Sequence, residues 1–176
     1  MEKTRLLIIV GPNGVGKSTT AMKIKEKNPG SAFVDSDWCR VMNPFTLTDI
    51  TKKTVIENIY CLLRNYLLCE EISTVIFTYS WHGGRKEIFD NVIKKLRNDK
   101  IDFQEIVVIL KCSESENRRR AFGDNRNEER VERGIKNTFL FYDEFEYPSI
   151  DTTNMTVLEV AERVWKIVDS NLCTSG

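Results

Sequence analysis

A run of eight residues near the amino terminus constrains this chain more than any other feature. Residues 11–18 read Gly-Pro-Asn-Gly-Val-Gly-Lys-Ser, a complete G-x-x-x-x-G-K-[ST] motif. The apolar segment 6–10 before it has the length of a buried strand, and residues 18–27 after it have a helical composition. That strand–loop–helix context distinguishes a phosphate-binding loop (the P-loop) from a glycine-rich turn that only joins a strand to a helix.

The residues of the P-loop have the chemistry to bind a nucleoside triphosphate. The glycines let the backbone fold into a nest of N–H donors, and the start of the helix adds its positive dipole end. Lys17 reaches the β- and γ-phosphates, and Ser18 provides a hydroxyl ligand for Mg²⁺. We therefore expect the nucleotide to be bound by Gly11, Asn13, Gly14, Val15, Gly16, Lys17, Ser18 and Thr19.

The composition narrows the class of protein. The 176 residues are 41% hydrophobic, which suffices for one domain over residues 1–176. There are 26 basic and 26 acidic residues, so no net charge attracts the chain to nucleic acid or to a membrane. The five cysteines contain no C-x-x-C pair and His82 is the single histidine, which disfavours a zinc site or a disulfide framework. The amino-terminal apolar run is too short for a signal peptide or a membrane span, so we expect a cytoplasmic protein.

Short apolar runs alternate with helical stripes along the chain. Strands are predicted at Arg5–Val10, Ala32–Asp35, Thr74–Tyr79, Glu105–Leu110 and Ser149–Asp151, and helices over 18–27, 47–67, 88–96 and after a capping box of Thr156 with Glu159. This alternation predicts an α/β fold, a three-layer αβα P-loop NTPase with a five-stranded parallel sheet. Ligands bind such sheets beyond the carboxyl ends of the strands, which selects the loops 11–18, 35–45, 79–85 and 111–130.

Two carboxylates follow the second predicted strand. Asp35 and Asp37 are two residues apart, so both point the same way if the extended backbone continues. We expect Asp35 to lie on the Mg²⁺ side and to accept a proton from the acceptor, and Asp37 to orient that acceptor. The alternative is that both only cap a helix or hydrate a turn. The third strand does not end in the metal-binding Asp of motor and GTPase proteins, which favours Asp35 as the metal-side carboxylate.

Other residues near the strand ends are candidates for binding the acceptor. Trp38 follows Asp37 and could form an acceptor wall, although packing explains an aromatic residue here equally well. Gly83 and Gly84 allow the backbone to approach a ligand closely. His82 is adjacent to them, but a single loop histidine is more often a bystander than a catalytic base.

The most highly charged stretch of the chain is 117–136. It could be a solvated helix face with ion pairs between neighbouring turns. Arginine also suits bidentate phosphate contact and stacking on a base, so an arginine-rich helical lid that closes over ATP is the functional interpretation. Arg120 and Arg126 fit that role best, with Arg130 and Arg133 as possible helpers.

The P-loop, the D-x-D pair, the arginine-rich stretch and a late I-D-T-T turn at 150–153 together resemble the small P-loop kinases. Shikimate kinase, gluconate kinase, the adenylate-kinase-like nucleotide kinases and uncharacterised AAA-family ATP-binding proteins are of this kind. The resemblance implies that Asp35 lies near Mg²⁺, Asp37 holds substrate, Arg120 stacks on adenine and Arg126 reaches the phosphates. It also implies that Asp151 and Thr152 pack beside adenine. The arginine-containing substrate helix of shikimate kinases has no match between Arg40 and Leu68, so shikimate is not the expected acceptor.

Together these features predict an ATP-dependent phosphotransferase that moves the γ-phosphate to a small-molecule hydroxyl or a nucleotide phosphate. The expected cofactors are ATP and Mg²⁺, the catalytic residues Lys17, Asp35 and Arg126, and the metal ligands Ser18 and Asp35. The acceptor is expected within 36–70, at Asp37 and Trp38, and at Gly83 and Gly84. We expect the protein to be a monomer or a homodimer. A nucleic-acid end kinase, a non-catalytic nucleotide-binding protein and an ATPase remain as alternatives, the first disfavoured by the balanced charge.

Overall fold

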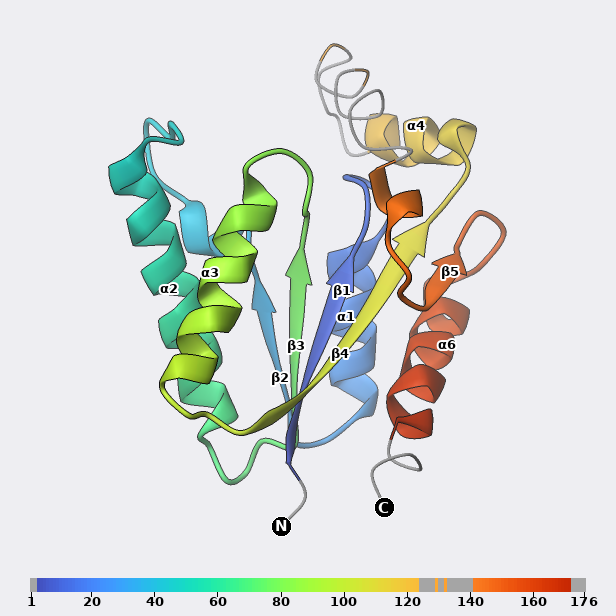
Figure 1. Cartoon of the computed structure of the whole chain (residues 1–176). Helices are drawn as coiled ribbons and strands as arrows, with labels where there is room; N and C mark the ends of the chain where they lie inside the picture. Colours follow the sequence, from blue (N-terminus) through green and yellow to red (C-terminus); the bar gives the residue numbers. More distant parts are fainter. Residues whose placement is uncertain (1–2, 124–128, 130–131, 133–140, 172–176) are drawn as a thin grey trace.

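The computed structural model describes residues 3–123, 129, 132 and 141–171. Its centre is a five-stranded sheet in the order β2-β3-β1-β4-β5, with all neighbouring strands parallel (Figure 1). The strands are β1 (Thr4–Val10), β2 (Ser31–Asp35), β3 (Thr74–Tyr79), β4 (Phe103–Lys111) and β5 (Ser149–Asp151). The five predicted strands are all present, with ends that differ by two residues at most.

Helices cover both faces of the sheet. On one face lie α1 (Lys17–Lys27) and α6 (Val157–Ser170), and on the other α2 (Asp49–Leu67) and α3 (Arg85–Asn98) (Figure 1). The short helices η1 (Trp38–Arg40) and η2 (Phe141–Glu144) and the helix α4 (Glu114–Gly123) belong to the connections. The predicted three-layer α/β fold with a five-stranded parallel sheet is therefore confirmed.

Residues 6–10 of the central strand β1 are all apolar, because helices cover both faces of the sheet there. Leu6, Leu7, Ile8, Ile9 and Val10 are all 0% exposed. Even-numbered side chains of this run belong to the core cluster under α2 and α3, and odd-numbered ones to the cluster under α1 and α6. A strand covered on both faces needs an uninterrupted apolar run, and the sequence has one there.

Hydroxyl side chains set the start of two helices. Thr156 accepts a hydrogen bond from the backbone N–H of Glu159 and the Glu159 side chain bonds back, so the predicted capping box is confirmed. Thr48 and Thr51 form a second box ahead of α2. Because Thr48 is the cap, Leu47 lies before the helix, where it is 45% exposed, and not within it as predicted.

All five strands end at the same edge of the sheet because they are parallel. The P-loop follows β1, η1 follows β2, the start of α3 follows β3, α4 follows β4 and the turn 152–156 follows β5. This carboxyl edge is the upper edge in Figure 1. In the described part of the chain, no helix has the length and apolar character needed to cross a membrane.

Candidate active site

Gly11 and Gly16 of the P-loop are glycines for different reasons. At Gly11, a Cβ atom would come within 2.3 Å of the Leu110 carbonyl oxygen, so any side chain would collide with β4. Gly16 caps the start of α1 at a φ of 101°, a conformation that other residues rarely adopt. The loop therefore packs closely against the sheet and then turns directly into the helix.

Side chains from neighbouring elements hold the P-loop. The Asn117 amide on α4 donates to the carbonyl oxygen of Asn13 at 3.0 Å, and the Arg120 guanidinium donates to that of Val15 at 3.0 Å. From the other side, the Ser80 hydroxyl donates to the Asn13 side chain at 3.2 Å. These bonds satisfy polar groups of the loop and favour a single loop conformation.

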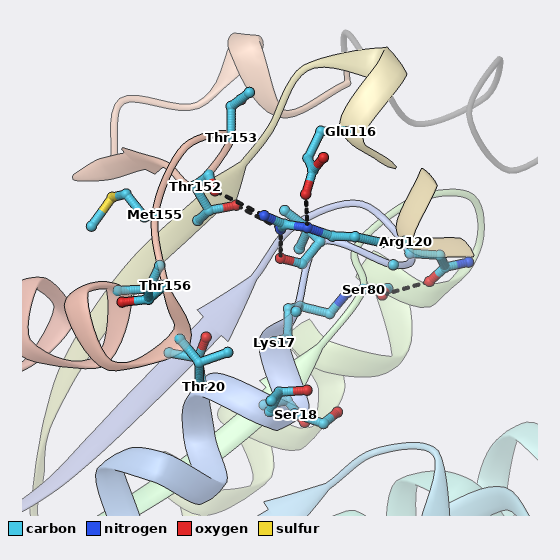
Figure 2. A pocket seen from close by; sticks show the side chains of 18 of the residues that line it. Lys17, Ser18, Thr20, Ser80, Glu116, Arg120, Thr152, Thr153, Met155 and Thr156 are labelled. Carbon is cyan, nitrogen blue, oxygen red and sulfur yellow. Dashed lines mark hydrogen bonds and ion pairs between the residues drawn. The ribbon is translucent and has the colours of Figure 1, made fainter. Parts of the chain in front are cut away.

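A cleft of about 870 Å³ opens above the P-loop. Its walls are formed by residues 13–20, 35–37, Thr78, Ser80, Glu116, Arg119, Arg120, 152–157 and Val160. This volume falls in the range that encloses a nucleotide-sized ligand. Figure 2 shows Lys17 and Ser18 at the start of α1 below Arg120. The Lys17 ammonium donates to the carbonyl oxygens of Gly11 and Pro12, at 2.9 and 2.8 Å.

Two oxygen-bearing side chains meet on the floor of the cleft. The Ser18 hydroxyl, at the start of α1, donates to a carboxylate oxygen of Asp35, at the end of β2, at 2.6 Å. The second Asp35 oxygen accepts the backbone N–H of Asp37 at 2.9 Å. Hydroxyl and carboxylate oxygens are the ligands that Mg²⁺ prefers, with water and substrate phosphates completing its shell. The donor set therefore fits Mg²⁺.

Arg120 links three elements on the β4 and β5 side of the cleft. Besides Val15, it donates to the Thr152 carbonyl oxygen at 2.8 Å and the Thr152 hydroxyl at 3.0 Å, and it pairs with Glu116 at 2.7 Å (Figure 2). Hydrogen bonds from Arg119 and Arg120 lower the pKa of Glu116 to about 2. Glu116 is therefore a carboxylate at neutral pH and keeps the Arg120 guanidinium oriented.

Basic side chains also follow β2 and β3 at the carboxyl edge of the sheet, outside the lining of the cleft. Asp37 forms an ion pair with Arg40 of η1. Arg85, the first residue of α3, lies 3.0 Å from the Nε2 atom of His82. Burial, with the charges of Arg85, Lys17 and Arg40, lowers the pKa of His82 to about 4. The imidazole is therefore neutral at pH 7.

Most of the expected nucleotide-binding residues line this cleft. They are Asn13, Gly14, Val15, Gly16, Lys17, Ser18, Thr19, Arg120 and Thr152, and the carboxylates Asp35 and Asp37 line it too. The sequence pattern does not predict Asn117, Ser80 and Glu116 as partners of these residues, or Arg85 as the partner of His82. All four lie in or beside the loops that follow the carboxyl ends of the strands, but nothing in the local sequence indicates their contacts.

Five expected site residues do not line the cleft. Gly11 packs under β4, and Asp151 instead accepts hydrogen bonds from the backbone and hydroxyl of Thr153. Trp38 is 78% exposed on η1. Gly83 and Gly84 are exposed where α3 begins. Arg126, like Arg130 and Arg133, lies outside the described residues.

Comparisons with known proteins agree with the observed fold. A family model described as AAA domain matches residues 7–140. No curated protein matches the chain by sequence. Among solved structures, a gluconokinase from Sinorhizobium meliloti 1021 is 15% identical over 100% of both chains, with a TM-score of 0.65. The shikimate kinase of Acinetobacter baumannii is 20% identical over 97% of this chain and 96% of its own, with a TM-score of 0.61. The APS kinase of Mycobacterium tuberculosis is 17% identical over 96% and 99%, with a TM-score of 0.63.

Proposed function

This chain belongs to the AAA domain family, and from that premise we propose that it is an ATP-dependent phosphotransferase acting on a small-molecule hydroxyl or a nucleotide phosphate. The observation that carries the proposal is the 2.6 Å contact between Ser18 and Asp35 on the floor of the P-loop cleft. It brings a metal-binding hydroxyl and a carboxylate to one point beside Lys17.

The P-loop side of the cleft binds the nucleotide in this proposal. The backbone N–H groups of residues 13–19 hold the phosphates, and Lys17 neutralises the charge that develops between the β- and γ-phosphates. Ser18 and Asp35 hold Mg²⁺, which supplies charge stabilisation on the phosphate oxygens when bound. Arg120 and Thr152 flank the base.

Phosphoryl transfer then takes place between the nucleotide and an acceptor near Asp37. An oxygen lone pair of the acceptor forms a bond to the γ-phosphorus, and the bond from that phosphorus to the β–γ bridging oxygen breaks, releasing ADP. When the acceptor is a hydroxyl, Asp35 takes its proton. Asp37 orients the acceptor. We also propose a single domain over residues 1–176, an acceptor-binding region at 36–70 and a lid at about 117–136 that includes Arg126.

An ATP-consumption screen over nucleosides, nucleotides, sugars and aminoglycosides tests the proposal. We expect acceptor-dependent release of ADP from the wild-type protein. Lys17→Ala should lower kcat/KM by at least about 100-fold, the usual effect of removing one charge-stabilising group. Lys23→Ala is the matched control, since Lys23 lies on α1 and, within the described part of the chain, pairs with the exposed Glu26 alone.

The outcome of the screen separates the alternatives. Full turnover by a folded Lys17→Ala variant would contradict the assignment of the P-loop. ATP hydrolysis that no acceptor stimulates would favour an ATPase. Transfer to oligonucleotide ends, with steep salt dependence, would favour a nucleic-acid end kinase.

A further inference from the structure

Arg85 differs from the other arginines at the carboxyl edge of the sheet. It is half-buried, and in the described ranges its one hydrogen-bond partner is His82, with no carboxylate within ion-pair distance. Arg40 pairs with Asp37, and the described lid arginines, Arg118–Arg120, all pair with glutamates. The guanidinium of Arg85 thus has no compensating negative charge in direct contact.

The surroundings of Arg85 add positive charge. Burial and the nearby Arg40 lower the pKa of Arg85. The charge on Arg40 is itself shared with Asp37, whose side chain is 74% exposed. Placing a cation out of water without a counter-charge costs free energy, and a bound anion removes that cost. Arginine is also the side chain whose fork of N–H donors matches phosphate and carboxylate groups.

His82 orients Arg85. A guanidinium only donates, so the Nε2 atom of His82 must accept, and the ring proton is then on Nδ1. The Nδ1 atom is buried and has no partner among the residues that the structure describes. Since the Nε2 lone pair already accepts from Arg85, His82 is not available as a base in this arrangement.

The strand order places Arg85 and His82 on the β2 and β3 side of the P-loop. Both follow β3 and Arg40 follows β2, while Arg120 and Thr152 follow β4 and β5 on the other side of β1. Lys17 is close enough to His82 to act on its protonation. Arg85 therefore lies on the acceptor side of the P-loop, across from the side we assign to the base.

We propose that Arg85, held by His82 and flanked by Arg40, receives an anionic group of the phosphoryl acceptor. The acceptor is then a phosphate- or carboxylate-bearing molecule and not a neutral nucleoside or sugar. His82 is a positioning residue that acts through Arg85. The substrate class rests on the proposed kinase function, whereas the anion site itself does not.

Histidine NMR tests the anion site without any enzymatic turnover. The chain has a single histidine, so ¹⁵N-histidine labelling of untagged protein reports His82 alone. In a Lys17→Ala background, which weakens anion binding by the P-loop, inorganic phosphate and acetate are titrated separately. We expect a saturable shift of the His82 signal with at least one of them, from a ring protonated on Nδ1.

Two further variants in the same background decide the result. Arg85→Gln should abolish the saturable shift. Arg97→Gln is the matched control on α3, because Arg97 is exposed and pairs with Glu105, and it should behave like the parent. No shift with either anion, or an equal shift after Arg85→Gln, would overturn the anion site. A stronger response to phosphate than to acetate would indicate a phosphate-bearing acceptor, and the reverse a carboxylate.

Kinetics then test the substrate class. Nucleoside monophosphates and sugar acids are compared with the matching nucleosides and neutral sugars. We expect turnover of the anionic members, and Arg85→Gln should raise the KM for the acceptor about 10- to 100-fold with the KM for ATP unchanged. His82→Gln retains an accepting oxygen and should retain more activity than His82→Leu. Turnover of neutral acceptors with equal kcat/KM before and after Arg85→Gln would overturn the proposal. Absence of any turnover would contradict the kinase function and leave the NMR result to decide the anion site.

Discussion

The carboxylate of Asp35 uses its two oxygens differently. One accepts the Ser18 hydroxyl and the other accepts the backbone N–H of Asp37. The first contact joins β2 to α1 and the second shapes the turn that follows β2. A substitution that keeps the shape of this side chain therefore removes the negative charge and the basicity of Asp35, together with one of these two hydrogen bonds.

Asp35→Asn is the substitution that does this. The amide keeps one accepting oxygen for Ser18, loses the acceptor of the Asp37 N–H, and does not take a proton from a hydroxyl acceptor. We expect nucleotide affinity to change by less than about 10-fold and kcat to fall by about 100- to 10,000-fold, the usual range for losing a general base. Calorimetry and ADP release measure the two quantities. An unchanged kcat would remove Asp35 from the mechanism.

Hydrogen bonds from Asn117 and Arg120 connect α4 to the P-loop. We therefore expect α4 to support the loop and not only to begin a lid. Both side chains donate to carbonyl oxygens of the loop, and Asn117 is 2% exposed. The composition of 117–136 indicates a charged surface helix, and it does so correctly for Arg118 and Arg119. It does not indicate the contacts of Asn117, because they depend on how closely α4 packs over the P-loop.

Asn117→Ala tests the coupling between α4 and the P-loop. The change leaves the Asn13 carbonyl oxygen without its donor, at a cost of about 1–3 kcal/mol in the free energy of unfolding. We also expect weaker nucleotide binding, since the loop is then less restrained. Urea denaturation and calorimetry check both effects. The control is Ser115→Ala, an exposed position on the same helix; equal behaviour of the two variants would contradict the coupling.

For the whole molecule, the sequence predicts the scaffold better than the site. Strands such as β1 and β3 can be predicted from the sequence, because a strand that is buried on both faces requires an uninterrupted apolar run. That Ser18 and Asp35 lie close together follows from the fold, since α1 begins and β2 ends at the same carboxyl edge of the sheet. The contact between Arg85 and His82 is different: the residues are three apart, but their burial and the nearness of Arg40 depend on tertiary packing.

His82 also gives the stability of the whole protein a specific pH dependence. Its pKa is about 4 in the folded chain and 6.5 as its ordinary value. Between these values the unfolded chain binds more protons at this residue, so the contribution of His82 to the free energy of unfolding is complete above about pH 6.5 and is lost as the pH drops toward 4. His82→Gln lacks this contribution. In urea denaturation at pH 7 and pH 5 we expect a smaller loss of stability for His82→Gln than for wild type; an equal loss would show that His82 is not held neutral.

Calorimetry of the purified wild-type chain with nucleoside triphosphate and excess Mg²⁺ is the most direct measurement of the central claim, that the P-loop cleft binds a nucleotide for phosphoryl transfer. We predict a saturable heat with ATP at one nucleotide per chain, weakened in Lys17→Ala and unchanged in Lys23→Ala. No heat with either adenine or guanine triphosphates, from protein shown to be folded, would contradict the claim.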